Sequence, residues 1–223
     1  MVPTNVQTHI GAEARTELIG KSKVCDAAES QAVLDRLVAR LSTAMHYDKP
    51  ITVTVVDLPI VNALALPGDQ IILFHRLLSE AQSPEEIAGV LAHEIGHLAA
   101  GHPARNLVRQ FGLSLVIMSL SGNSNWDGVA QLLLANAYTR QFEAEADTRA
   151  LDTLEAASIG GQGWIDFFDR HAQRSGGWDR ATAYFANHPP SAERRDRATR
   201  LPPTGTPVMS AGDWLVLQSI CAK

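Results

Sequence analysis

The segment HEIGH at positions 93–97 constrains the fold of this chain most strongly, because it can bind a metal ion only when it forms a helix. Residues four apart share one face of a helix, so the imidazoles of His93 and His97 can coordinate one Zn²⁺. Glu94 is offset by one residue, and its carboxylate can reach past the metal and accept a proton from water. A serine followed by proline at 83–84 is typical of a helix start. We therefore predict an active-site helix that carries zinc.

A catalytic zinc site needs a third protein ligand. The extended metzincin pattern is excluded, because Ala100 and Pro103 stand where glycine and histidine are required. Further along, Glu143 and Asp147 share one helix face, whereas Glu145 points away and should be solvated. Asp147 could hold the outer nitrogen of a ligand histidine. By periodicity alone, an acidic face in solvent is the simpler interpretation of these carboxylates.

The pattern of apolar residues predicts a small β-sheet near the front of the chain and helices elsewhere. We expect one α+β, helix-dominated domain over 1–223, with N-terminal helices in 1–48, the sheet and metal helix in 50–103, and the third-ligand and C-terminal helices in 104–223. Within it, we expect helices over 26–49, 84–103, 128–157 and 164–174 and strands over 51–56, 61–66 and 70–74, the last two joined as a hairpin.

The net charge of −5 argues against nucleic-acid binding, which normally needs a basic domain. Residues 1–20 contain no apolar core of the signal-peptide type, so we expect either a cytoplasmic protein or a form that lacks its signal or anchor. The apolar stretch 111–120 is shorter than the roughly 20 residues of a spanning helix. It could be a buried helix, a lid over the site or a membrane contact.

Cys25 and Cys221 lie near opposite ends of the chain. They could be two small buried residues, or they could form a disulfide, which would imply an oxidising compartment. Because the sequence does not supply the distance between them, both interpretations stay open.

Several motifs together resemble the M48 peptidase family, which includes HtpX, the CAAX prenyl endoprotease and BepA. The HEIGH segment at 93–97 is followed by EAEAD at 143–147, as in that family. Residues 62–68 look like its strand and turn before the metal helix, and residues 188–194 like its downstream His-Pro…Arg element. These motifs span 62–194, most of the chain. One departure is Asp69, where a second glycine is common.

The resemblance implies a zincin domain of the gluzincin type with one Zn²⁺ per chain. His93, His97 and Glu143 would bind the metal, with Asp147 behind them. Glu94 would act as general base and then as general acid.

The resemblance also implies further roles around the metal. His188 and Arg194 would stabilise the oxyanion, or His188 would instead close the fourth zinc position. Asn62, Ala63, Leu64 and Ala65 would form an edge strand that pairs with an extended substrate backbone. Tyr138 and Tyr184 are weaker candidates for stabilising the oxyanion, and packing in the core is the favoured expectation for both. We expect His102 to lie at an exposed helix end.

The implied function is an endopeptidase that cuts internal peptide bonds of extended or unfolded proteins, in quality control of the bacterial cell envelope. The protein would be periplasmic or membrane-anchored, with protein or peptide partners and a membrane close by, although a cytoplasmic location and the oligomeric state stay open. One alternative is a latched or non-proteolytic zinc protein that binds unfolded peptides. Another is a zinc hydrolase for a non-peptide substrate, against which the edge strand argues.

Overall fold

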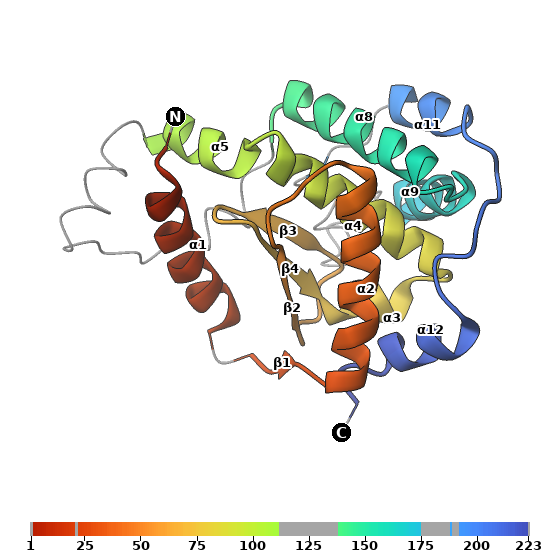
Figure 1. Cartoon of the computed structure of the whole chain (residues 1–223), viewed down its shortest axis with the longest axis horizontal. Coiled ribbons are helices and arrows are strands. Elements are labelled where there is room, and N and C mark those ends of the chain that lie inside the picture. Colours follow the sequence, from red (N-terminus) through yellow and green to blue (C-terminus); the bar gives the residue numbers. More distant parts are fainter. Residues whose placement is uncertain (1, 21, 112–137, 175–187, 189–191, 223) are drawn as a thin grey trace.

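The computed structural model describes residues 2–20, 22–111, 138–174, 188 and 192–222. Helices dominate this part of the chain and surround one small sheet, as the sequence predicts (Figure 1). The helices are α1 (Thr4–Ile19), α2 (Ala28–Ala44), α3 (His75–Glu80), α4 (Pro84–Ala99), α5 (His102–Phe111), α8 (Arg140–Ala156), α9 (Gln162–Arg174), α11 (Ala192–Ala198) and α12 (Ala211–Gln218).

The sheet has four strands in the order β1-β2-β4-β3, namely β1 (Val24–Cys25), β2 (Thr52–Val56), β4 (Gln70–Phe74) and β3 (Ala63–Leu66). The parallel β2 and β4 form its centre, and β3 pairs antiparallel with β4 in a register that sets Leu66 opposite Gln70. The predicted hairpin is therefore confirmed. Its turn contains Gly68 and Asp69, both at positive φ, a conformation that glycine adopts without strain.

Apolar side chains cover both faces of the sheet. On one face, Ala14 and Leu18 of α1 pack in a cluster with Leu64 and Phe74. On the other face, α2 and α4 share a larger core with α8 and α9 (Figure 1). The helix α4 also contacts β3 directly. The edge strand β3 therefore lies beside the predicted active-site helix.

The helices α4 and α8 approach each other closely at Gly96. A Cβ atom at this position would lie 3.0 Å from the carbonyl oxygen of Ala146. The side chain of a larger residue at this position would therefore clash with the backbone of α8. The close approach at Gly96 brings the HEIGH helix against the helix that carries Glu143 and Asp147.

The bounds of several described helices differ from the prediction. Of the helix expected over 128–157, residues 128–137 lie outside the described residues. The described part, α8, begins at Arg140, because the side chain of Thr139 accepts a hydrogen bond from the amide of Phe142 and caps it. The helix expected to reach 103 ends at Ala99, because Gly101 at φ +66° turns the chain before α5 begins. The helix α1 lies in the stretch 1–48 where N-terminal helices are expected, but its bounds were not predicted, since its pattern of apolar residues is weak.

Cys25 and Cys221 are joined by a disulfide, with a Cα–Cα distance of 4.8 Å. The bond attaches β1 to the segment after α12 and settles the alternative that the sequence left open. Among the described helices, none combines the length and the apolar character needed to cross a membrane.

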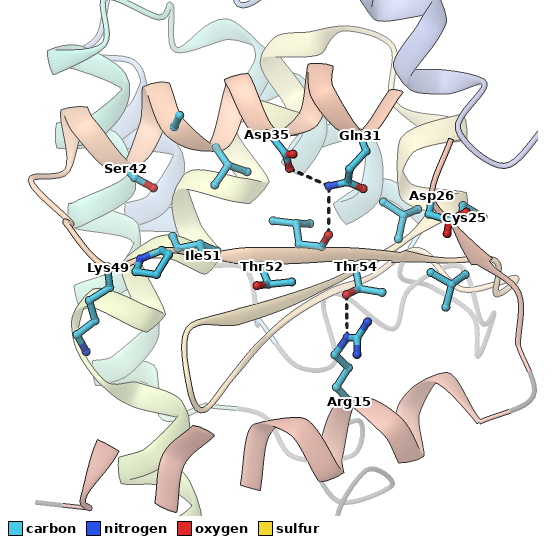
Figure 2. Close-up of a pocket in the computed structure, with 16 residues that line it drawn as sticks. Arg15, Cys25, Asp26, Gln31, Asp35, Ser42, Lys49, Ile51, Thr52 and Thr54 are labelled. Carbon is cyan, nitrogen blue, oxygen red and sulfur yellow. Dashed lines mark hydrogen bonds between the residues drawn. The ribbon is translucent and has the colours of Figure 1, made fainter. Parts of the chain in front are cut away.

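A cavity of about 640 Å³ lies between α1, β2 and α2, as Figure 2 shows. Arg15 of α1 donates to the hydroxyl of Thr54 on one side, and Gln31 of α2 donates to the Val53 carbonyl on the other. The residues that line this cavity include none of the predicted site residues. The cavity is therefore separate from the predicted site residues on α4.

Candidate active site

The helix α4 carries three of the predicted site residues into the core. The Ser83 side chain accepts from the amide of Glu86, and Pro84 occupies the first turn, so the predicted helix start is confirmed. His93, Glu94 and His97 are all fully buried. Polar groups buried in this way need partners, and these include Glu143 and Asp147 of α8 and the imidazole of His188.

Two histidines of α4 and a glutamate of α8 converge on one point. His93 Nε2 lies 2.9 Å from His97 Nε2 and 3.5 Å from Glu143 Oε2, and His97 Nε2 lies 3.3 Å from Glu143 Oε1. Ligand atoms bound at about 2.0–2.1 Å to one tetrahedral zinc ion lie roughly 3.3 Å apart. The donor types and the spacing of these side chains therefore fit a zinc ion.

His188 joins the same group. Its Nδ1 lies 3.1 Å from His93 Nε2 and 3.0 Å from Glu143 Oε1, and its Nε2 lies 3.5 Å from Glu94 Oε1. One ligand atom from each of His93, His97, Glu143 and His188 lies within 4.8 Å of the others. Four protein groups thus surround a position suited to one metal ion.

A second layer of charges supports these groups. Asp147 Oδ1 lies 2.9 Å from the outer nitrogen of His93, where the sequence predicts a supporting carboxylate. Arg194 donates from Nε to Asp147 at 2.6 Å and from Nη2 to Glu143 at 2.9 Å. Glu143 and Asp147 are both buried between α4 and Arg194, so the alternative that periodicity alone favours, a solvated acidic face, is excluded.

The edge strand reaches the site through Ala65. Its amide donates to Glu94 Oε2 at 2.9 Å, and its carbonyl accepts from the Tyr138 hydroxyl at 3.4 Å. Ala63 donates its amide to Asn62 Oδ1, while Asn62 Nδ2 is buried and has no hydrogen-bond partner among the described residues. The outer edge of β3 therefore lies directly beside the carboxylate of Glu94.

The pKa values of the ionisable groups in this site shift in opposite directions. Burial raises the pKa of Glu94. Burial opposes the charge of Glu143, but the neighbouring His188 and His93 outweigh it and hold its pKa well below the usual range. Likewise, burial opposes the charge of His93, but hydrogen bonds to Asp147 and Glu143 raise its pKa to about 9, whereas burial lowers the pKa of His97. Carboxylate groups with such divergent environments are typical of catalytic sites.

Two residues differ from their predicted positions. His102 is fully buried and contacts His97, so its assignment to an exposed helix end is wrong. The ring of Tyr138 stacks on His97 at a centroid distance of 4.1 Å, which places it in the site rather than in the core alone. Glu145, expected in solvent, is partly exposed but interacts with His102 and Arg149.

The sequence named Tyr138 only as a weaker site candidate and did not indicate the burial of His102, because both contacts depend on how α5 and the residues before α8 pack against α4. Tyr184 and the segment 112–120 lie outside the described residues.

A family model described as Peptidase family M48 matches residues 27–201. The chain is 32% identical over 150 residues to Metalloprotease YcaL of Escherichia coli, which covers 61% of this chain and 58% of the relative. It is 30% identical over 190 residues to a Putative beta-barrel assembly-enhancing protease of Vibrio cholerae, covering 76% of this chain and 39% of the relative.

The chain is also 30% identical over 145 residues to Mitochondrial metalloendopeptidase OMA1 of Arabidopsis thaliana, which covers 64% of this chain and 30% of the relative. It thus spans less than two thirds of the length of each of these relatives.

Proposed function

The chain belongs to peptidase family M48, as the motifs at 93–97 and 143–147 predict, and from this premise we propose that it is a zinc-dependent endopeptidase for extended protein chains. The observation that carries the proposal is the position of Glu94. Its carboxylate lies beside the zinc-fitting group of His93, His97 and Glu143 and also bonds the outer edge of β3. One residue thus faces both the metal position and the strand that would hold a substrate.

The metal would be held by His93, His97 and Glu143. A zinc ion held there would supply a water of lowered pKa, about 7, and would polarise a peptide carbonyl. Asp147 accepts the outer proton of His93 and so keeps the inner nitrogen free for coordination. Arg194 balances the charge of the two α8 carboxylates.

Glu94 would accept the proton of the attacking water and deliver it to the leaving amine. Its burial raises its pKa, and a carboxylate with a raised pKa is a better proton acceptor near neutral pH than an ordinary one. The amide of Ala65 now holds Glu94 Oε2. A substrate strand that paired with this amide would release the carboxylate for proton transfer.

The strand β3 would bind the substrate by strand addition. Its inner side pairs with β4, whereas Ala65 directs its amide and carbonyl outward, to Glu94 and Tyr138. The buried Asn62 Nδ2 offers a further donor for a peptide carbonyl. These groups recognise a backbone and not particular side chains, which suits extended or unfolded protein substrates.

His188 and Arg194 would contribute positive charge or hydrogen bonds near the developing oxyanion. Arg194 already bonds both α8 carboxylates, so we assign it chiefly to holding Glu143 and Asp147. His188 Nδ1 lies close to His93 Nε2 and Glu143 Oε1, which supports a role as a fourth ligand. Because the site residues are buried, a substrate can enter only after some part of the chain moves.

We further propose that the protein works in the bacterial cell envelope and removes misfolded proteins there, close to a membrane. The disulfide between Cys25 and Cys221 supports an oxidising compartment. One relative in the comparison is described by name as beta-barrel assembly-enhancing, which is consistent with an envelope role.

Time-resolved digestion of unfolded casein by the zinc-loaded protein tests the proposal. We expect Glu94→Gln to keep its zinc but to lose about 10²- to 10⁴-fold in cleavage rate, the usual contribution of a general base. Glu85→Gln, in the first turn of the same helix, is the matched control and should cleave as the parent does. Full activity of Glu94→Gln would overturn the assignment of Glu94 as the base.

His188 also supports a second candidate, a latched zinc protein that binds unfolded peptides without cutting them. The observation in its favour is that His188 approaches both His93 and Glu143 closely. In that case the parent would bind casein and zinc but leave casein intact. If His188→Ala then cleaves casein, His188 blocks the site in the parent and the protein is a regulated protease. If it does not, the protein is a binding module.

A further inference from the structure

His102 lies against the metal-ligand candidate His97 although it belongs to the next helix. The helix α4 ends at Ala99, and Gly101 at φ +66° lies in the turn before α5 begins at His102. This turn returns the His102 ring to the core, where it is fully buried. Its Nδ1 lies 2.9 Å from Nδ1 of His97.

The two imidazoles can share this contact in only one neutral arrangement. His97 directs Nε2 toward Glu143 and His93, so Nε2 must keep its lone pair for a metal and the proton must lie on Nδ1. That proton is donated to His102, whose Nδ1 must then be the acceptor. The remaining proton of His102 lies on Nε2, which is 3.3 Å from the Glu145 carboxylate. Every donor in this chain thus faces an acceptor.

Neighbouring side chains hold the His102 ring in the required plane. The ring stacks on Phe142 with a centroid distance of 4.2 Å and an interplanar angle of 10°. Arg105 covers the Phe142 ring as well, at 4.5 Å from its centroid, and Arg149 holds Glu145 through an ion pair of 3.2 Å. Phe142 directly precedes Glu143, so the same packing connects His102 to the helix of the third ligand candidate.

We infer that His102 is a positioning residue for the metal site, which fixes the tautomer and the ring orientation of His97 and connects it to Glu145. The two ligand histidines are thus supported differently: His93 bonds Asp147 directly, and His97 reaches a carboxylate through a second imidazole. Outer partners of this kind commonly change metal affinity by about 10- to 100-fold when they are lost. The inference rests on the zinc site of the proposed function.

Two substitutions at position 102 separate hydrogen bonding from packing. His102→Phe keeps a ring to stack on Phe142 but has no acceptor for His97, and His102→Asn loses the stacking but places an amide oxygen where Nδ1 lies. Zinc affinity is measured by competition with a chromophoric chelator, and the absorption spectrum of the cobalt-substituted protein reports the ligand geometry. His75→Phe is the control, because His75 is a partly buried histidine at the start of α3 that interacts with Asp57.

We expect His102→Phe to bind zinc about 10- to 100-fold more weakly and to shift the cobalt spectrum, while His102→Asn recovers most of the affinity and His75→Phe matches the parent. Zinc binding by His102→Phe equal to that of the parent, or weaker binding by the asparagine variant than by the phenylalanine variant, would overturn the inference. If His102→Phe does not fold, His102→Gln takes its place, because its amide reaches the position of Nε2 and should leave His97 without an acceptor.

The two proposals fail in different ways. If the parent binds zinc but never cleaves a substrate, the proposed activity is overturned. The zinc affinities of the His102 variants still test the role of His102 in that case. A parent that binds no zinc overturns both.

Discussion

Arg194 Nη2 lies 2.9 Å from Glu143 Oε2, so an arginine of α11 directly supports the third metal-ligand candidate on α8. The same guanidinium bonds Asp147, which faces His93. All of these side chains are buried, and the charges of the two carboxylates are therefore balanced inside the protein and not by water.

Replacement of Arg194 by methionine should destabilise the protein and weaken zinc binding. It leaves Glu143 and Asp147 buried without their cation, and breaking a buried pair in this way costs about 3–5 kcal/mol. Urea unfolding and chelator competition measure the two effects. The matched control is Arg195→Met on the same helix, because Arg195 pairs with Asp169 at the surface and should change stability by less than about 1 kcal/mol. Equal stability of the two variants would contradict the role of Arg194.

Enlargement of Gly96 should separate the two helices that carry the ligand candidates. A Cβ there meets Ala146 atoms at 3.0 and 3.3 Å, and valine adds two more carbons. We expect Gly96→Val to lose about 1–3 kcal/mol of unfolding free energy and to bind zinc more weakly than the parent. Gly212→Ala is the control, since a Cβ at 212 meets its nearest atom only at 3.8 Å. Unchanged zinc affinity in Gly96→Val would show that the separation of α4 and α8 does not govern the site.

Reduction of the disulfide should lower the stability of the protein. The bond joins Cys25 and Cys221 across a sequence separation of 196 residues, and loss of a native disulfide typically costs about 2–5 kcal/mol. Thermal unfolding with and without dithiothreitol measures the effect. The double variant Cys25→Ser/Cys221→Ser should unfold at the lower temperature in both conditions. An unfolding temperature of the parent that does not change with dithiothreitol would contradict the prediction.

Zinc binding should release a proton near neutral pH. In the metal-free protein, burial opposes the charge of His93, but Asp147 and Glu143 raise its pKa to about 9, whereas a ligand histidine must be neutral. The apparent zinc affinity should therefore rise with pH up to about 9. Titration calorimetry in two buffers of different ionisation enthalpy counts the proton, and Asp147→Asn should reduce the release. Proton-independent binding would refute the prediction.

The raised pKa of His93 also predicts how the stability of the metal-free protein changes with pH. A histidine pKa that is raised on folding stabilises the protein fully below the unfolded value of about 6.5. This contribution is lost as the pH rises through about 9, where the folded His93 loses its proton. Metal-free protein should therefore lose this part of its unfolding free energy between about pH 6.5 and 9.

Local periodicity was enough to predict much of this protein. The spacing of four between His93 and His97 places both imidazoles on one face of any helix, and Ser83 with Pro84 marks where that helix begins. The hairpin from 63 to 74 follows in the same way from two short apolar strands that flank the turn residues Pro67, Gly68 and Asp69. These features depend on residues that are close in the sequence, so short-range geometry alone determines them.

Contacts between distant segments were decided only by the tertiary structure. Periodicity could not tell a buried Glu143 and Asp147 from a solvated face, because the difference lies in Arg194 and His188, which approach from another part of the chain. The turn at Gly101 decided that His102 is buried against His97, and the meeting of the chain ends decided that Cys25 and Cys221 are bonded. Such contacts result from how helices and strands pack, and packing depends on all elements of the core at once.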